Sequence, residues 1–100
     1  MTSLYLYENN FTGDLPVSIF NLPNVVRIKL SHNQLSGIIP NEICNVEKVY
    51  LNHNNFYGLI PPCVCEMTKI EIYNNWLCEE YPDCLDEEAI GVQNPTECSK

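Results

Sequence analysis

One thirteen-residue pattern occurs three times in this chain and begins a fourth time. Each copy contains apolar residues at alternate positions, followed at fixed offsets by an Asn, an apolar residue, a Gly and a Pro. The Asn residues of the four copies are 24, 21 and 21 residues apart: Asn9, Asn33, Asn54 and Asn75. A repeat of about 20 to 50 residues at a fixed period is typical of a solenoid, in which each repeat forms one coil.

The alternating part of each copy predicts a short β-strand. In the second copy, Ile28 and Leu30 point to one side of the strand, and Lys29 points to the other. The first side must be the core, because its two positions are apolar in all four copies: Leu4, Leu6, Ile28, Leu30, Val49, Leu51, Ile70 and Ile72. The strands of successive coils are therefore expected to pair as one sheet.

The residues after each strand predict how the chain turns back. The amide of each Asn can donate and accept hydrogen bonds where the backbone turns inward. The apolar residue two positions later, such as Phe11 or Phe56, is expected to point into the core. The Gly that follows suits a tight turn with positive φ, and the Pro then opens a return segment with a short 3₁₀ run.

This pattern resembles the plant-type leucine-rich repeat, x-L-x-L-x-x-N-x-L-x-G-x-I-P, over residues 2–98. The resemblance implies an α/β solenoid with a short parallel β-sheet on its concave face and 3₁₀ or loop returns. It places about three and a half coils in residues 1–77 and a cysteine-containing C-terminal cap in residues 78–100. Since no polar segment covers coil one, we expect coil one to expose an apolar end. We also expect the chain to be the C-terminal part of a longer repeat protein or an incomplete gene model.

Six cysteines in 100 residues indicate an oxidising compartment. All six are disulfide candidates: Cys44, Cys63, Cys65, Cys78, Cys84 and Cys98. The family resemblance implies that the last three form a cap together with Cys65, and four cysteines allow three connectivities. No metal site is predicted, because the spacings lack a pair of C-x-x-C motifs.

Cys44 and Cys65 leave a second arrangement open. They occupy the same position in adjacent coils, and neighbouring strands lie about 4.8 Å apart. This spacing is within the range that a disulfide bridges. Cys65 therefore pairs either back to Cys44 or forward into the cap, with Cys63 in the other role, unless Cys44 is a free thiol.

Net charge and motif content exclude several function classes. The chain carries a net charge of −8, and seven of its thirteen acidic residues lie at or after Glu79, which argues against nucleic-acid or anionic-membrane partners. The run from Asp86 to Glu88 is predicted to be a solvated helical face. No stretch of about 18 apolar residues predicts a membrane span. No nucleophile lies beside a His and an orienting acid, so neither catalytic residues nor a cofactor are predicted.

The outward positions of the predicted strands hold four of the five basic residues and four of the six tyrosines. Tyr and positive charge favour protein recognition. The candidate binding residues are Tyr5, Arg27, Lys29, Lys48, Tyr50, Lys69 and Tyr73. The alternative is a solvated strand surface, because Tyr has high β-propensity and basic residues deter edge pairing. His32 and His53 are expected to stack on the same face.

Together, these features predict a non-enzymatic recognition module that binds a protein, peptide or polysaccharide, including acidic partners, on its concave face. The resemblance implies receptors and inhibitors of cell-wall-degrading enzymes. The alternative is a structural or surface-adsorbing repeat, such as an ice-binding or matrix protein, which would favour files of small hydroxylated residues. An extracellular or cell-surface location is predicted from the cysteines, the resemblance and the glycosylation sequon Asn10-Phe11-Thr12.

Overall fold

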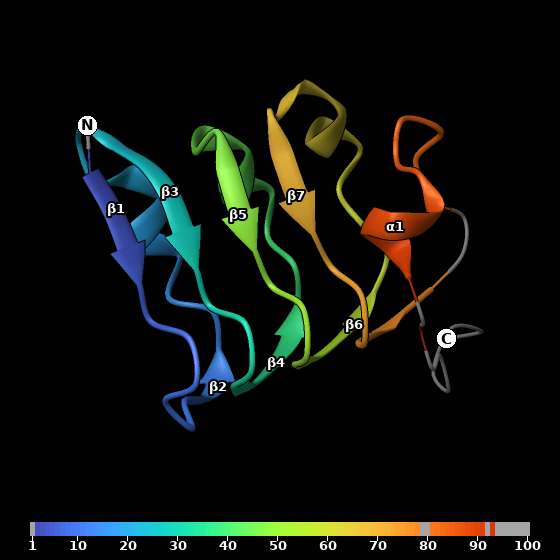
Figure 1. Cartoon of the computed structure of the whole chain (residues 1–100), viewed down its shortest axis with the longest axis horizontal. Coiled ribbons are helices and arrows are strands. Elements are labelled where there is room, and N and C mark those ends of the chain that lie inside the picture. Colours follow the sequence, from blue (N-terminus) through green and yellow to red (C-terminus); the bar gives the residue numbers. More distant parts are fainter. Residues whose placement is uncertain (1, 79–80, 92, 94–100) are drawn as a thin grey trace.

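A computed structural model describes residues 2–78, 81–91 and 93 of the chain, and Figure 1 shows them as a stack of coils. Four strands, β1 (Thr2–Tyr5), β3 (Val25–Lys29), β5 (Lys48–Tyr50) and β7 (Lys69–Glu71), form a parallel sheet in that order. Each strand is followed by a turn that leads down to a second sheet. The predicted boundary between residues 77 and 78 stays a prediction, because much of the proposed cap lies outside the described residues.

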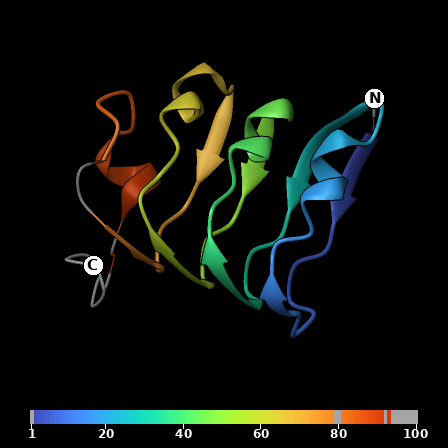
Figure 2. The same cartoon turned by 180° about the vertical axis from the view of Figure 1, so that it is seen from behind.

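The second sheet consists of β2 (Thr12–Asp14), β4 (Gln34–Ile38), β6 (Asn55–Gly58) and β8 (Trp76–Leu77), and it is also parallel. Between one coil and the next, the chain passes through the 3₁₀ helices η1 (Val17–Asn21), η2 (Asn41–Asn45) and η3 (Pro62–Glu66). Figure 2 shows these helices in front of the first sheet when the molecule is seen from behind. A short helix, α1 (Glu87–Ile90), follows the last coil.

The core lies between the two sheets and the 3₁₀ helices. Ile28, Val49 and Ile70 occupy the same register position in neighbouring strands, and all three are buried as the alternation predicted. Among the described residues, coil one has a neighbouring coil on one side only. Phe11 is 42% exposed there, whereas Phe56 at the same position of the third coil is fully buried. The expectation that Phe11 is buried was wrong, and the expectation that coil one exposes apolar residues is confirmed.

The second sheet was not predicted from the sequence. Gly13, Gly37 and Gly58 do adopt positive φ, at +85°, +90° and +84°, but they lie in β2, β4 and β6 rather than in turns. At Gly37 a Cβ atom would come within 2.6 Å of Asp14 Oδ1 of the preceding coil. Glycine is therefore favoured there chiefly by its backbone conformation, since the exposed Asp14 side chain can rotate away.

Buried asparagines join the coils to one another. Asn54 Nδ2 donates to Leu30 O (2.9 Å) and Leu51 O (3.1 Å), and Asn54 Oδ1 accepts from Leu35 N (3.1 Å). Two of these three partners, Leu30 and Leu35, belong to the preceding coil. Asn33 and Asn75 make the equivalent bonds in their coils. We call this column of Asn33, Asn54 and Asn75 the amide ladder.

The two ends of the ladder differ. At the N-terminal end, Asn9 is exposed, and its side chain donates only to Tyr7 O (3.0 Å) within the described residues. At the other end, Gln93 supplies the next amide. Its Nε2 donates to Ile72 O (2.7 Å) and its Oε1 accepts from Leu77 N (2.9 Å). Gln93 thus makes the bonds that a fifth coil's asparagine would make.

Helix α1 follows the last coil and packs against β7. Asp86 caps it by accepting from Ala89 N at 2.9 Å. Glu87 and Glu88 lie in its first turn and are exposed, where carboxylates are favoured by the helix dipole. This confirms the predicted solvated acidic face.

Removal of a ladder amide should destabilise the fold. We expect Asn54→Ala to lower the free energy of unfolding by about 1 to 3 kcal/mol, because buried backbone groups of two coils lose their partners. Asn55→Ala is the matched control, since Asn55 is exposed and should change stability little. Urea unfolding of both variants measures the difference, and equal midpoints would contradict the role assigned to the ladder.

Candidate functional site

The outward side chains of β1, β3, β5 and β7 form a surface that we call the strand face. Strand pairing aligns Ser3, Arg27, Lys48 and Lys69 in one column, and Tyr5, Lys29, Tyr50 and Glu71 in the next. These are the columns that the repeat spacing predicted. A parallel sheet in fixed register produces them, because equivalent positions of successive coils become lateral neighbours.

Four of the predicted binding residues contact one another at the N-terminal end of the strand face. Lys29 Nζ lies 5.2 Å from the ring centroid of Tyr5 and 5.1 Å from that of Tyr50. Both distances suit a cation–π interaction. Arg27 Nη1 donates to Tyr5 Oη at 3.2 Å, and this hydrogen bond lowers the pKa of Tyr5. Arg27 Nε is buried and has no partner among the described residues.

The other three predicted residues, Lys48, Lys69 and Tyr73, take no part in these cation–π and hydrogen-bond contacts. Lys48 is the register neighbour of both Arg27 and Lys69. Lys69 forms an ion pair of 3.7 Å with Glu71, the only ion pair within the described residues. Arg27, Lys29 and Lys48 therefore have no carboxylate partner in the described part of the chain, and positive charge is concentrated on β3 and β5.

Tyr73 belongs to a separate aromatic group. The His32 and His53 rings stack as predicted, with centroids 4.2 Å apart and planes 15° apart. Tyr73 meets His53 edge-on at 5.4 Å. Glu8, His32, His53 and Asn74 precede the Asn position of each coil, and all have positive φ near 60°. Sequence analysis did not predict this left-handed backbone, although Asn and His tolerate it better than most residues.

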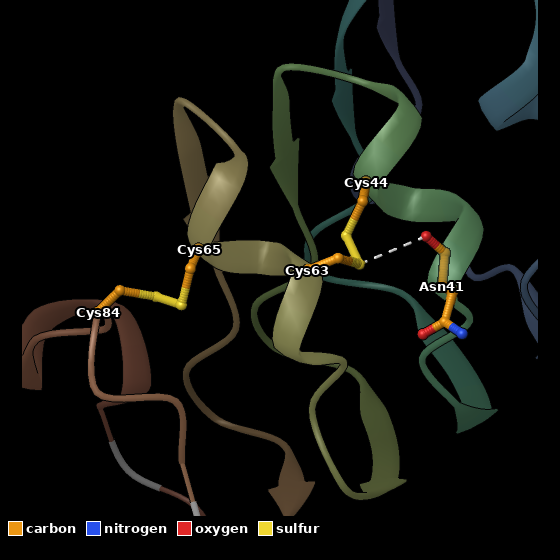
Figure 3. Close-up of a disulfide and its surroundings, with 5 residues drawn as sticks. All are labelled: Asn41, Cys44, Cys63, Cys65 and Cys84. Carbon is orange, nitrogen blue, oxygen red and sulfur yellow. Dashed lines mark hydrogen bonds between the residues drawn. A yellow bond between two sulfur atoms is a disulfide. The ribbon is translucent and has the colours of Figure 1, made fainter.

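The cysteines cross-link successive returns. Cys44 of η2 is bonded to Cys63 of η3, and Cys65 of η3 is bonded to Cys84 (Figure 3). Of the arrangements left open by the sequence, Cys65 therefore pairs with a cysteine of the predicted cap, Cys84, and Cys63 pairs with Cys44 of the preceding return. Cys78 is also disulfide-bonded, and Cys98 lies outside the described residues. The 3.7 Å approach of Cys63 Sγ to Asn41 O, dashed in Figure 3, is a packing contact because an oxidised sulfur carries no proton.

The glycosylation candidate Asn10 lies in the turn between β1 and β2, at the N-terminal end of the molecule. Asn10 is exposed and has a φ of 60°. Thr12 of the sequon is the first residue of β2 and is also exposed. The position is accessible, and modification of Asn10 stays a prediction. Within the described residues, no helix reaches the length and apolarity needed to cross a membrane.

Residues 1–22, 24–46 and 45–67 match the family model described as Leucine Rich Repeat. These segments cover more than half of the sequence. The chain belongs to the leucine-rich repeat family. The Asn–Gly–Pro spacing of residues 1–67 is therefore that of leucine-rich repeats.

Solved structures of plant leucine-rich repeat receptors share this fold. The ectodomain of BIR2 from Arabidopsis thaliana has a TM-score of 0.76 and 24% identity, and the match covers 87% of this chain and 52% of that one. The ectodomain of GASSHO1/SCHENGEN3 from Arabidopsis thaliana, in complex with CASPARIAN STRIP INTEGRITY FACTOR 2, has a TM-score of 0.67 and 34% identity over 77% of this chain and 10% of that chain.

A third similar structure is the Arabidopsis receptor kinase HAESA, in complex with the peptide hormone IDA and the co-receptor SERK1. It has a TM-score of 0.67 and 34% identity, and the match covers 76% of this chain and 14% of HAESA. This leucine-rich repeat chain thus spans about half of BIR2 and a much smaller part of the two receptor kinases.

The pKa of His53 should lie below the ordinary value of an imidazole. Burial, and secondarily the charge of His32, lowers the pKa of His53. The unfolded imidazole therefore takes up its proton at higher pH than the folded one, so stability should fall as the pH drops below about 6.5. We expect His32→Gln to raise the pKa of His53 in an NMR titration. An unchanged His53 pKa would show that the neighbouring imidazole contributes nothing.

The disulfide between η2 and η3 should stabilise the solenoid by restricting the unfolded chain. The two cysteines are 19 residues apart. We expect the double variant Cys44→Ala/Cys63→Ala to lose about 3 kcal/mol in urea unfolding, since the closed loop is of this size. Thiol counting in denaturant without reductant tests the pairing directly. Free thiols at these positions in protein from an oxidising host would contradict it.

Proposed function

We propose that this leucine-rich repeat chain is a non-enzymatic, extracellular recognition module that binds an acidic protein or peptide on its concave strand face. The observation that carries the proposal is the cluster of Arg27, Lys29, Tyr5 and Tyr50. It combines uncompensated positive charge with aromatic rings in a chain whose net charge is −8.

The arrangement of the cluster favours recognition over mere solubility. A lysine in solution is flexible, but Lys29 lies between two tyrosine rings that hold its ammonium group in place. An ordered side chain loses less conformational entropy when a partner binds.

The similar receptors agree with a protein or peptide partner. GASSHO1/SCHENGEN3 and HAESA were solved in complex with CASPARIAN STRIP INTEGRITY FACTOR 2 and with a peptide hormone and a co-receptor, respectively. The strand face of this chain is the extended surface on which we place such a partner. Leucine-rich repeat ectodomains are typically non-catalytic, which agrees with the non-enzymatic role.

Two features support the proposed extracellular location. The chain has disulfides between η2, η3 and the segment before α1, and structural disulfides persist in oxidising compartments. The similar structures named above include receptor ectodomains. We place the chain outside the cell or on its surface, with Asn10 as an accessible site for a glycan.

Charge reversal separates the strand face from the acidic helix. An acidic peptide would be selected from a peptide array and then titrated against Lys29→Glu/Lys48→Glu and against Glu87→Lys/Glu88→Lys. We expect the first variant to slow association about tenfold or more, because electrostatic steering is reversed. Added salt should weaken binding to the unmodified chain. If the helix variant loses binding and the lysine variant retains it, the strand face is not the binding site.

A further inference from the structure

An open hollow lies where the turns after β3, β5 and β7 enter the second sheet, away from the basic cluster. Its volume is about 460 Å³, within the range of about 300 to 1,000 Å³ that small-ligand sites occupy. The amide ladder contributes to the lining. Five further side chains line it: Gln34, His53, Asn55, Asn74 and Trp76. We call this feature the amide hollow.

The repeat places these side chains in two columns. Gln34, Asn55 and Trp76 are the first residues of β4, β6 and β8. His53 and Asn74 precede the ladder positions, and their left-handed backbone is shared by both coils. The hollow therefore extends across three consecutive coils, and each coil contributes side chains at the same offsets.

Several polar groups of the amide hollow are free for a ligand. The ladder amides are used within the fold, but Gln34 and Asn55 are exposed. Among the described residues, the Gln34 amide and the Asn55 Nδ2 group have no hydrogen-bond partner. Each amide carries a donor and an acceptor side by side. Such a pair can bind two adjacent hydroxyl groups of one ligand.

Trp76 supplies an aromatic face beside these amides. Its Nε1 donates to Asn55 Oδ1 at 3.3 Å, which fixes the indole ring, and the residue remains 37% exposed. Tryptophan combines a large apolar surface with one polar edge. The ring is therefore positioned to pack against an apolar ligand face while the neighbouring amides bind its polar edge.

The lining carries no carboxylate, ammonium or guanidinium group. Burial also lowers the pKa of His53, which keeps its imidazole neutral at neutral pH. An ionic ligand would find no counter-charge here. Recurring modes of peptide recognition use a sheet edge, an apolar groove or a charge cluster. The lining is rich in amides and has no charge cluster, although Trp76 belongs to β8, an edge strand of the second sheet.

We propose that the amide hollow is a binding site for a neutral oligosaccharide, distinct from the proposed peptide site on the strand face. Ring hydroxyls would exchange hydrogen bonds with Gln34, Asn55 and Asn74, and one apolar sugar face would pack on Trp76. Because the hollow is open and the contacts are few, the dissociation constant should be about 1 mM.

The single tryptophan makes this site directly measurable, since Trp76 is the only one in the chain. Intrinsic fluorescence would be recorded during titration with a neutral trisaccharide of β-1,4-linked glucose, up to about 50 mM so that a millimolar site saturates. Side-chain amide resonances of Gln34 and Asn55 in NMR spectra give a second readout. A trisaccharide of galacturonic acid and an uncharged peptide of Gly, Ser and Asn serve as competing ligand classes.

Matched variants decide whether the signal comes from the amide hollow. We expect Gln34→Ala to weaken trisaccharide binding about fivefold to tenfold, because the exposed hydrogen bonds of an amide with no partner within the described fold are lost. Asn45→Ala is the control, since Asn45 is an exposed amide of η2 that bonds Asn21 instead. It should leave binding unchanged, as should Lys29→Glu/Lys48→Glu.

Three outcomes would overturn the proposal. The first is the absence of a saturable change in both readouts, and the second is equal binding by the Gln34→Ala variant and the unmodified chain. The third is preferential binding of the charged trisaccharide or the peptide. Acidic-peptide binding is measured in parallel, so failure here leaves the strand-face proposal to its own test.

Discussion

The bonds of the amide ladder are the constraint on which the rest of the solenoid depends. A single coil turns sharply after its strand, and its inward carbonyl and amide groups have no strand partner at that point. Asn54 satisfies such groups in its own coil and in the preceding one. Each coil therefore completes the hydrogen bonding of its neighbour. The alignment of both sheets, and of every column on their surfaces, follows from this dependence.

The two surfaces proposed for binding are products of the same register. On the strand face, alignment places Lys29 between Tyr5 and Tyr50, which are 24 and 21 residues away in the sequence. Below it, alignment places Asn55 next to Trp76. The first surface is charged and aromatic, whereas the second is neutral and rich in amides. One periodic backbone thus presents two chemistries that suit different ligands.

The sequence predicts those parts of the structure that recur in every coil. Strand positions, the inward Asn column and the stacked pair of His32 and His53 follow from period and alternation. The second sheet was missed because β2, β4 and β6 each contain a Gly with positive φ, which sequence patterns associate with turns. The disulfide connectivity was left open, because Cys63 and Cys65 are equally close in sequence to several partners. The hollow beside Trp76 depends on side-chain packing, which the alternation of apolar and polar residues does not predict.

Gln93 has a consequence for how such proteins change length during evolution. Gln93 lies outside the repeats, but its side-chain amide bonds Ile72 O and Leu77 N as the asparagine of a further coil would. The terminal segment therefore recognises only the last coil and is insensitive to the number of coils before it. The ladder hydrogen bonds have the same pattern at each described junction, so duplication of an internal coil preserves that pattern. A gene of this kind can gain or lose whole repeats in single events. Each such event lengthens or shortens the binding surface by one strand.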